Sequence, residues 1–187
     1  MKDIYRGKLV RLAVEAPEVM TKAHARWERD TEFHRLADGD PAQLWSEKKI
    51  REWIEKEMED DPLRALRFSI RTLNDDKLIG FVGLRPDWIH ADAWIGIGIG
   101  EREYWGKGYG TDAMRLIVQY AFLEANLRRV TLGLHSYNAR ALKSYEKVGF
   151  KLEGVLRSDT LREGRRTDGI YMGLLREEWQ ALQGVAA

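Results

Sequence analysis

The chain has 187 residues, of which 44% are hydrophobic and 33% charged, and this composition is typical of one globular domain. Lys and Arg number 31 and Asp and Glu 30, so the net charge of +1 disfavours a nucleic-acid-binding protein, which needs a basic surface. The absence of cysteine excludes disulfides, thiolate metal ligands and cysteine nucleophiles.

Neither a metal site nor a membrane segment is indicated by the sequence. The four histidines, His24, His34, His90 and His135, are scattered, and no two have the spacing that places two metal ligands on one helix face. No apolar run reaches the roughly 18 residues of a membrane-spanning helix. The first ten residues lack the apolar core of a signal peptide. We therefore expect a cytoplasmic protein without a bound metal.

Apolar periodicity predicts a mixed α/β domain with a central sheet of about seven strands and four flanking helices. The strands are expected at residues 8–14, 66–73, 77–84, 93–100, 130–134, 150–156 and 169–175. The helices are expected at residues 18–36, 46–59, 111–125 and 138–148. The three consecutive central strands predict an antiparallel meander, and the helix that links 93–100 to 130–134 predicts a parallel pair.

The most informative segment is W-G-K-G-Y-G-T at residues 105–111, which follows a strand and opens a helix. Glycines at alternate positions, Gly106, Gly108 and Gly110, let the backbone approach a ligand closely. Their amides, together with those of the first helical turn, would line an anion site, and Lys107 adds a positive charge. The segment therefore predicts a pyrophosphate site, and the alternative is a tight turn that only lets strand and helix pack.

Two established nucleotide motifs do not fit this loop. The spacing is G-x-G-x-G rather than the G-x-G-x-x-G of dinucleotide-binding folds, and no acidic residue follows at the distance that a ribose requires. The P-loop pattern G-x-x-x-x-G-K-[ST] is absent as well.

A second candidate segment is the helix at residues 138–148. Asn138 and Tyr145 are seven residues apart, so their side chains face the same way along a helix. An amide and a phenol on one face suit a ligand that has amide groups and a polar reacting end. Taken singly, Asn138 is better explained as a helix cap and Tyr145 as a core aromatic residue.

Together, W-G-K-G-Y-G-T at 105–111, N-A-R-A-L-K-S-Y-E-K-V-G-F at 138–150 and K-L-E-G-V-L-R at 151–157 resemble the GNAT superfamily of acetyl-CoA-dependent N-acetyltransferases. Within it the chain looks most like the ribosomal-protein N-terminal (alanine) acetyltransferases. The resemblance covers about residues 8–178 and leaves 1–7 and 179–187 as short terminal extensions. It implies a single GNAT-type domain in which the parallel strands splay apart.

The resemblance implies that acetyl-CoA binds the glycine-rich loop and the strand before it. The family's loop usually begins with Gln or Arg, where this chain has Trp105, so phosphate binding would depend on backbone amides and Lys107. Gly100 also departs from the family, which usually has an apolar residue there. The implied cofactor-binding residues are Gly98, Ile99, Gly100, Trp105, Gly106, Lys107, Gly108, Tyr109, Gly110, Thr111, Asn138 and Tyr145.

The implied reaction is direct attack of an amine on the thioester, with no protein nucleophile. A backbone N–H near Ile99 would stabilise the negative charge that develops, and Tyr145 would be the catalytic hydrogen-bond donor to the departing thiolate. The general base is not identified by the resemblance. The titratable residues that flank the strand are Asp92, His90, Glu101 and Glu103, and each is better explained as a solvated surface group.

The acceptor is expected to be a primary amine, either of a protein N-terminus or of a small molecule. The alternatives are a polyamine, an aminoglycoside-like xenobiotic amine, or a CoA-binding module without turnover. The implied acceptor side is the region between the first strand and the second helix, which carries charges of both signs. Exposed members of the seven tryptophans could form a homodimer face.

Overall fold

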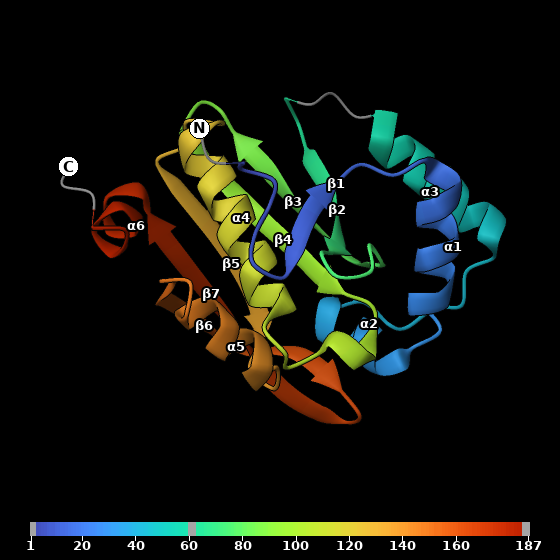
Figure 1. Ribbon diagram of the computed structural model, residues 1–187. Helices are drawn as coiled ribbons and strands as arrows, with labels where there is room; N and C mark the ends of the chain where they lie inside the picture. Colours follow the sequence, from blue (N-terminus) through green and yellow to red (C-terminus); the bar gives the residue numbers. More distant parts are fainter. Residues whose placement is uncertain (1–2, 60–62, 185–187) are drawn as a thin grey trace.

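The computed structural model describes residues 3–59 and 63–184. Within them, seven strands form one sheet, and six α-helices and one 3-10 helix surround it (Figure 1). In chain order the elements are β1 (Val10–Ala13), α1 (Pro17–Trp27), α2 (Thr31–Ala37), α3 (Glu47–Glu59), β2 (Leu66–Thr72), β3 (Leu78–Asp87), β4 (Asp92–Ile99), η1 (Arg102–Tyr104), α4 (Tyr109–Leu123), β5 (Arg129–His135), α5 (Ala139–Glu146), β6 (Lys151–Arg162), β7 (Arg165–Leu175) and α6 (Arg176–Leu182).

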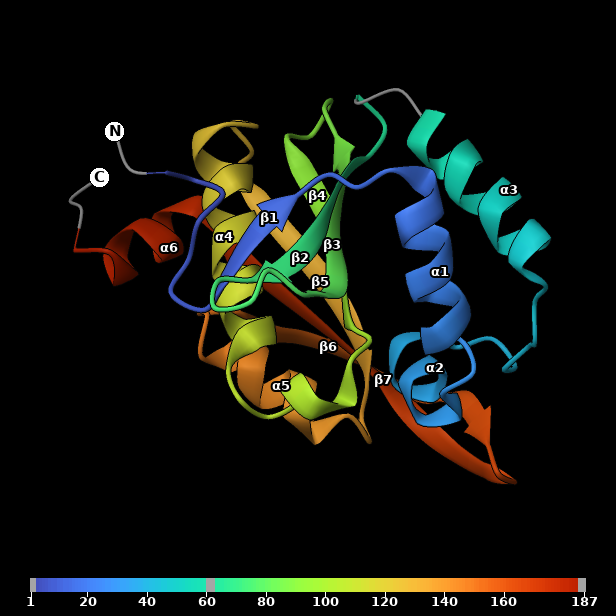
Figure 2. The same cartoon turned by 45° about the vertical axis from the view of Figure 1, so that its right-hand side comes forward.

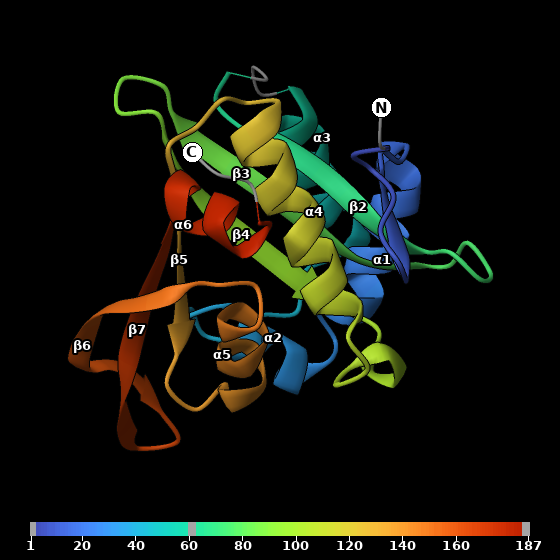
Figure 3. The ribbon, with the colours of Figure 1, turned by 60° about the vertical axis from the view of Figure 1, so that its left-hand side comes forward.

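The sheet has the order β1-β2-β3-β4-β5-β7-β6, and every neighbouring pair is antiparallel except β4 and β5. The predicted mixed sheet, with its meander and its parallel pair, is therefore confirmed. Helices α4, α5 and α6 lie on one face of the sheet, as Figure 3 shows. Helices α1, α2 and α3 lie on the other (Figure 2).

The main core lies between α4 and the sheet. Met114, Ile117 and Phe122 of α4 are almost completely buried against sheet residues such as Ile79 and Leu132. Burial of one such side chain contributes about 1.5–3 kcal/mol to the free energy of unfolding. Helix α4 therefore holds together the strands that it contacts, which include β3, β4 and β5. None of the helices in the described part of the chain has the length and hydrophobicity that a membrane crossing requires.

The helix expected at residues 18–36 is in fact two helices. Asp30 ends the run, because its side chain accepts hydrogen bonds from the backbone amides of Glu32 and Phe33 and so caps a new helix, α2. Trp27, the last residue of α1, is 1% exposed and packs against Phe33. After the break, α2 contacts β5.

The end of the chain also differs from the prediction. Strands β6 and β7 extend well beyond 150–156 and 169–175, as a hairpin that turns at Glu163 and Gly164, both with positive φ. Helix α6 is a further helix that the sequence pattern does not predict. It docks through Trp179, whose ring lies 5.5 Å from that of Phe122. Six helices therefore flank the sheet instead of four.

Candidate active site

The site is built on an opening between the two parallel strands. β4 and β5 pair only over Asp92, Ala93 and Trp94, although β4 continues to Ile99. Beyond Trp94, β4 stays paired with β3 while β5 follows β7. The predicted splay between the parallel strands is thus present, and it begins immediately after Trp94.

The splay leaves part of the backbone of β4 without strand partners. Gly100 donates its amide hydrogen to the carbonyl of Ile79 on the β3 side, at 2.9 Å. Because the amides of successive strand residues point to opposite edges, the amide and carbonyl groups of Ile97 and Ile99 point towards β5. These groups can form hydrogen bonds with an extended ligand that enters the opening.

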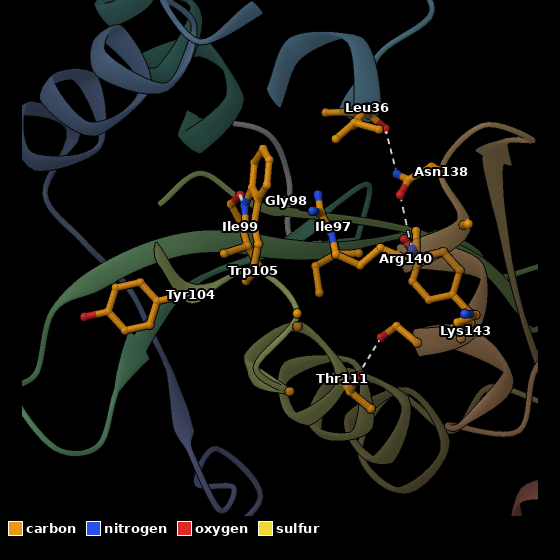
Figure 4. Close-up of a pocket in the computed structure, with 18 of the residues that line it drawn as sticks. Leu36, Ile97, Gly98, Ile99, Tyr104, Trp105, Thr111, Asn138, Arg140 and Lys143 are labelled. Carbon is orange, nitrogen blue, oxygen red and sulfur yellow. Dashed lines mark hydrogen bonds between the residues drawn. The ribbon is translucent and has the colours of Figure 1, made fainter. Parts of the chain in front are cut away.

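A cavity of about 460 Å³ occupies this opening and the space between the glycine-rich loop, α5 and α2 (Figure 4). Its lining brings together nine of the twelve predicted cofactor-binding residues, namely Gly98, Ile99, Trp105, Gly106, Gly108, Gly110, Thr111, Asn138 and Tyr145. Loop, strand and helix, which are separate in sequence, thus face one hollow.

Three predicted residues lie outside that lining. Gly100 packs under an aromatic ring, since a Cβ there would lie 2.1 Å from Trp27. Tyr109 makes an edge-to-face contact with Tyr104, at 4.9 Å between ring centroids. Lys107 is exposed at the loop. The glycine at position 100 is therefore explained by packing against Trp27.

The glycine-rich loop presents a run of unused hydrogen-bond donors. Gly106 and Gly108 have φ angles of 72° and 91°, which other residues rarely adopt. None of the backbone amides from residue 106 to residue 111 donates to an acceptor in the described part of the chain. The last three of them begin α4, whose dipole places partial positive charge at the same point. The loop can therefore bind an anion.

Positive side chains on α5 face this cavity. Arg140, Lys143 and Lys147 all line it, and the guanidinium of Arg140 stacks over the ring of Trp105 at 4.1 Å. These three residues were not predicted from the sequence, where Lys107 was the expected positive charge. Their spacing of three and then four residues, which puts them on one helix face, was the available signal.

Trp105, which departs from the family pattern, has a structural role in this protein. Its indole Nε1 donates to the carbonyl of Ile99 at 2.6 Å. The indole therefore satisfies a backbone acceptor that the splay leaves open, and it fixes the end of β4 beside the loop. Figure 4 shows the two residues side by side.

Hydrogen bonds also fix the position of α5. Asn138 caps it by accepting from the amide of Ala141 at 3.1 Å, and it donates to the carbonyl of Leu36 at 3.3 Å. Thr111 and Ser144 share a hydrogen bond of 2.7 Å, which joins α5 to the start of α4. Asn138 thus acts as a helix cap and ties α5 to α2.

Tyr145 lines the cavity and is half-buried. Its ring packs near Phe150, and its phenol forms no hydrogen bond to any residue that the structure describes. Burial raises the pKa of Tyr145 to about 12. The phenol is therefore protonated at neutral pH and can donate a hydrogen bond into the cavity.

The titratable groups beside β4 are engaged elsewhere. Burial raises the pKa of Glu101, but hydrogen bonds from Trp27 and Arg26 outweigh this effect and lower it overall. Glu103 forms an ion pair with Lys77, and Asp92 forms one with Arg128. Of the four candidates for general base (these three and His90), none lines the cavity.

The predicted acceptor region is likewise internally paired. Arg102 binds the carboxylates of both Asp30 and Glu32, and His34 lies 3.5 Å from the carboxylate of Glu28. These contacts hold α2 against η1. Arg102 therefore neutralises Asp30 and Glu32 of this region.

Comparison with known proteins agrees with this geometry. Residues 11–151 match the family model described as an acetyltransferase (GNAT) domain. The prophage-derived uncharacterized N-acetyltransferase YokL of Bacillus subtilis is 29% identical over 140 residues, 74% of this chain and 76% of YokL. The putative ribosomal N-acetyltransferase YdaF of the same organism is 35% identical over 109 residues, 58% of this chain and 59% of YdaF.

Among solved structures, spermidine N-acetyltransferase from Vibrio cholerae in complex with CoA and spermine has the same fold. The TM-score is 0.79 at 24% identity, over 91% of this chain and 97% of that one. The family match covers most of this chain and includes the splayed strands and the glycine-rich loop. The chain belongs to the GNAT family and is an N-acetyltransferase.

Proposed function

We propose that this protein transfers the acetyl group of acetyl-CoA to a primary amine by direct attack of the amine on the thioester. The observation that carries this proposal is the run of unpaired backbone amides at residues 106–111, beside the opening between β4 and β5. In the proposed complex these amides, Arg140 and Lys143 bind the diphosphate. The backbone groups of Ile97 and the amide of Ile99 pair with the amide groups of the pantetheine arm, since the carbonyl of Ile99 already accepts from Trp105.

The amine nitrogen forms a bond to the thioester carbonyl carbon, the carbon–sulfur bond breaks with its electron pair going to sulfur, and the amine loses a proton to solvent. A backbone N–H at Ile97 or Ile99 binds the carbonyl oxygen as its negative charge increases. Tyr145 donates its hydrogen bond to the leaving sulfur, and its raised pKa keeps this donor protonated. No protein nucleophile takes part.

The proposed catalytic domain covers residues 8–178, and its acceptor is the amine of a protein N-terminus or of a small molecule. YdaF is named for a ribosomal acceptor and the Vibrio cholerae enzyme for spermidine. Proteins and spermidine both carry primary amines, which supports the class of acceptor without choosing between them.

Binding of the phosphate-bearing end of CoA is tested by calorimetry with CoA and with pantetheine, which lacks both the diphosphate and the phosphorylated adenosine. We expect CoA to bind and pantetheine to bind at least about a hundredfold more weakly, since charge-assisted hydrogen bonds to the phosphates are lost. Absence of CoA binding would refute the proposal. Binding without acetyl transfer to any amine in a broad panel would favour the non-catalytic CoA-binding alternative.

The role of Tyr145 is tested by Tyr145→Phe, with Tyr5→Phe as the control because Tyr5 is exposed and does not line the cavity. We expect Tyr145→Phe to keep its affinity for CoA and to lower kcat at least about tenfold, since only the leaving-group donor is removed. Unchanged kcat, measured by thiol release, would exclude Tyr145 from this role.

A further inference from the structure

A second cavity, of about 310 Å³, is lined by residues of α1, α3, β3 and β4. Helices α1 and α3 cover this face of the sheet (Figure 2). Its walls are aromatic, with Trp53 of α3, Phe81 of β3 and Trp94 of β4. On its floor, a Cβ added at Gly96 would meet no atom within 4 Å. The cavity therefore has room for an apolar group against the middle of β4.

The two cavities meet β4 at neighbouring residues. Gly96 lines the second cavity, and the next residues, Ile97 and Gly98, line the first. The strands separate directly after Trp94, so the opening between them begins at this level. The ring of Phe81 lies over Gly98, at 2.8 Å from a Cβ built there, and separates the cavities further along.

A buried histidine in this cavity lacks a polar partner. His24 is 5% exposed, stacks on Phe81 and makes edge contacts with Trp27 and Trp53. Its Nδ1 is buried, and neither ring nitrogen forms a hydrogen bond with a described residue. Buried polar groups are nearly always paired. A ligand in the cavity would supply the missing partner to the neutral imidazole.

Among the charged residues that line the second cavity, the carboxylates are paired and one arginine is not. Glu15 is held by Arg71, with an N–O distance of 2.6 Å, and Glu57 forms an ion pair with Arg67. Arg85, at the exposed rim, forms neither an ion pair nor a hydrogen bond with any residue in the described part of the chain. The cavity therefore offers a free cation and no free carboxylate among its lining residues.

We propose that this cavity is the acceptor site and that the acceptor is a primary amine with an apolar body and a carboxylate. The inference rests on the proposed acetyl transfer and assigns its substrate class. Arg85 binds the carboxylate, the aromatic walls hold the apolar body, and the amine reaches the opening beside Gly96. Arg85 lies opposite Trp94 in the pairing of β3 with β4. Trp94 is three residues before Ile97, which is about 10 Å along the strand. The carboxylate and the amine of the acceptor are therefore several bonds apart. Polyamines, which carry only positive charges, fit this site poorly.

The test compares alanyl-phenylalanine, its C-terminal amide and spermidine as acceptors for the wild-type protein and for Arg85→Gln. In the wild type we expect kcat/KM to be at least about fivefold higher for the free acid than for the amide, and lowest for spermidine. Arg85→Gln is expected to bring the acid and the amide within about twofold. Arg165→Gln, which removes an exposed arginine at the far end of the β6–β7 hairpin, is expected to keep the wild-type ratio.

Gly96→Val tests the cavity independently of charge. Open space above Gly96 and the strand preference of valine favour a folded protein, while the new side chain occupies the floor. We expect KM for the dipeptide to rise at least about tenfold with an unchanged Kd for CoA. An unchanged acid-to-amide ratio in Arg85→Gln, a preference for spermidine, or acetyl-CoA binding without dipeptide turnover would overturn the inference. Absence of acetyl-CoA binding would instead overturn the proposed function itself.

Discussion

The unpartnered histidine in the second cavity makes stability depend on pH in a way that can be calculated. Burial lowers the pKa of His24 from 6.5 to about 4, because the surrounding rings of Trp27, Trp53 and Phe81 cannot solvate a charge. Above pH 6.5 the ring is neutral in both folded and unfolded chains. As the pH falls from 6.5 to 4, the unfolded chain binds this proton first, so acid destabilises the folded state.

The size of the effect follows from the shift in pKa. At pH 4.5 the histidine is almost fully protonated in the unfolded chain and mostly neutral in the folded one, which costs the folded state about 2–3 kcal/mol. In His24→Phe this cost is absent, while the stacking on Phe81 can be kept. The variant should therefore gain about 2–3 kcal/mol over the wild type between pH 7.5 and pH 4.5.

Urea unfolding, followed by tryptophan fluorescence at the two pH values, measures this difference directly. His90→Gln is the control, because His90 is exposed and removal of its ring should leave the pH dependence near that of the wild type. Equal m values would confirm that the unfolded states are comparable. If His24→Phe and the wild type lost the same free energy of unfolding on acidification, the imidazole would be hydrated in the folded protein and the reasoning would fail.

Two further substitutions test how the loop is supported. Gly100→Ala should lower the free energy of unfolding by about 2–3 kcal/mol and the Tm by roughly 5–10 °C, because its Cβ would overlap the ring of Trp27. The control is Gly96→Ala, which has open space and should leave the Tm within about 2 °C of the wild type. Equal Tm values, by calorimetry, would contradict this. Asp112→Ala should cost about 3 kcal/mol, since its carboxylate accepts from three backbone amides at residues 8–10. A smaller loss in Asp112→Asn, which keeps one acceptor oxygen, is the expected contrast in urea unfolding.

Local sequence signals predicted the fold where a short segment determines its own conformation. The glycines at 106 and 108 adopt the left-handed conformations that their type permits, and Asn138 caps the helix that follows it. The strand pattern of residues 93–100 gave β4 within one residue at each end. These features depend on neighbours in the sequence, so alternation, caps and turns were sufficient.

Features that depend on distant residues were not predictable in this way. The charged sequence of residues 157–168 resembles a loop, yet most of it forms strand, because β6 and β7 continue as a hairpin whose pairing resumes at Thr160 and Thr167 after an irregularity. The break at Asp30 depends on Trp27 and Phe33 burying together, and α6 depends on the docking of Trp179. Helical spacing could have identified Arg140, Lys143 and Lys147, but only the fold shows that they face the glycine-rich loop.

The two cavities differ in how well their ligand-binding residues can be predicted from the sequence. Around the opening between β4 and β5, the groups that face the ligand are largely backbone amides, at residues 106–111 and on β4. A backbone amide is present whatever the side chain, so these positions leave little signal in the sequence. Glycine is needed there only where φ is positive, so the motif is short and permits Trp105 at its start. In the second cavity, the free groups are the side chains of Arg85 and His24, which β3 and α1 bring into one lining. Because the backbone provides one half of the site and individual side chains the other, acceptor preference can change through substitutions at Arg85 while the first half keeps its geometry.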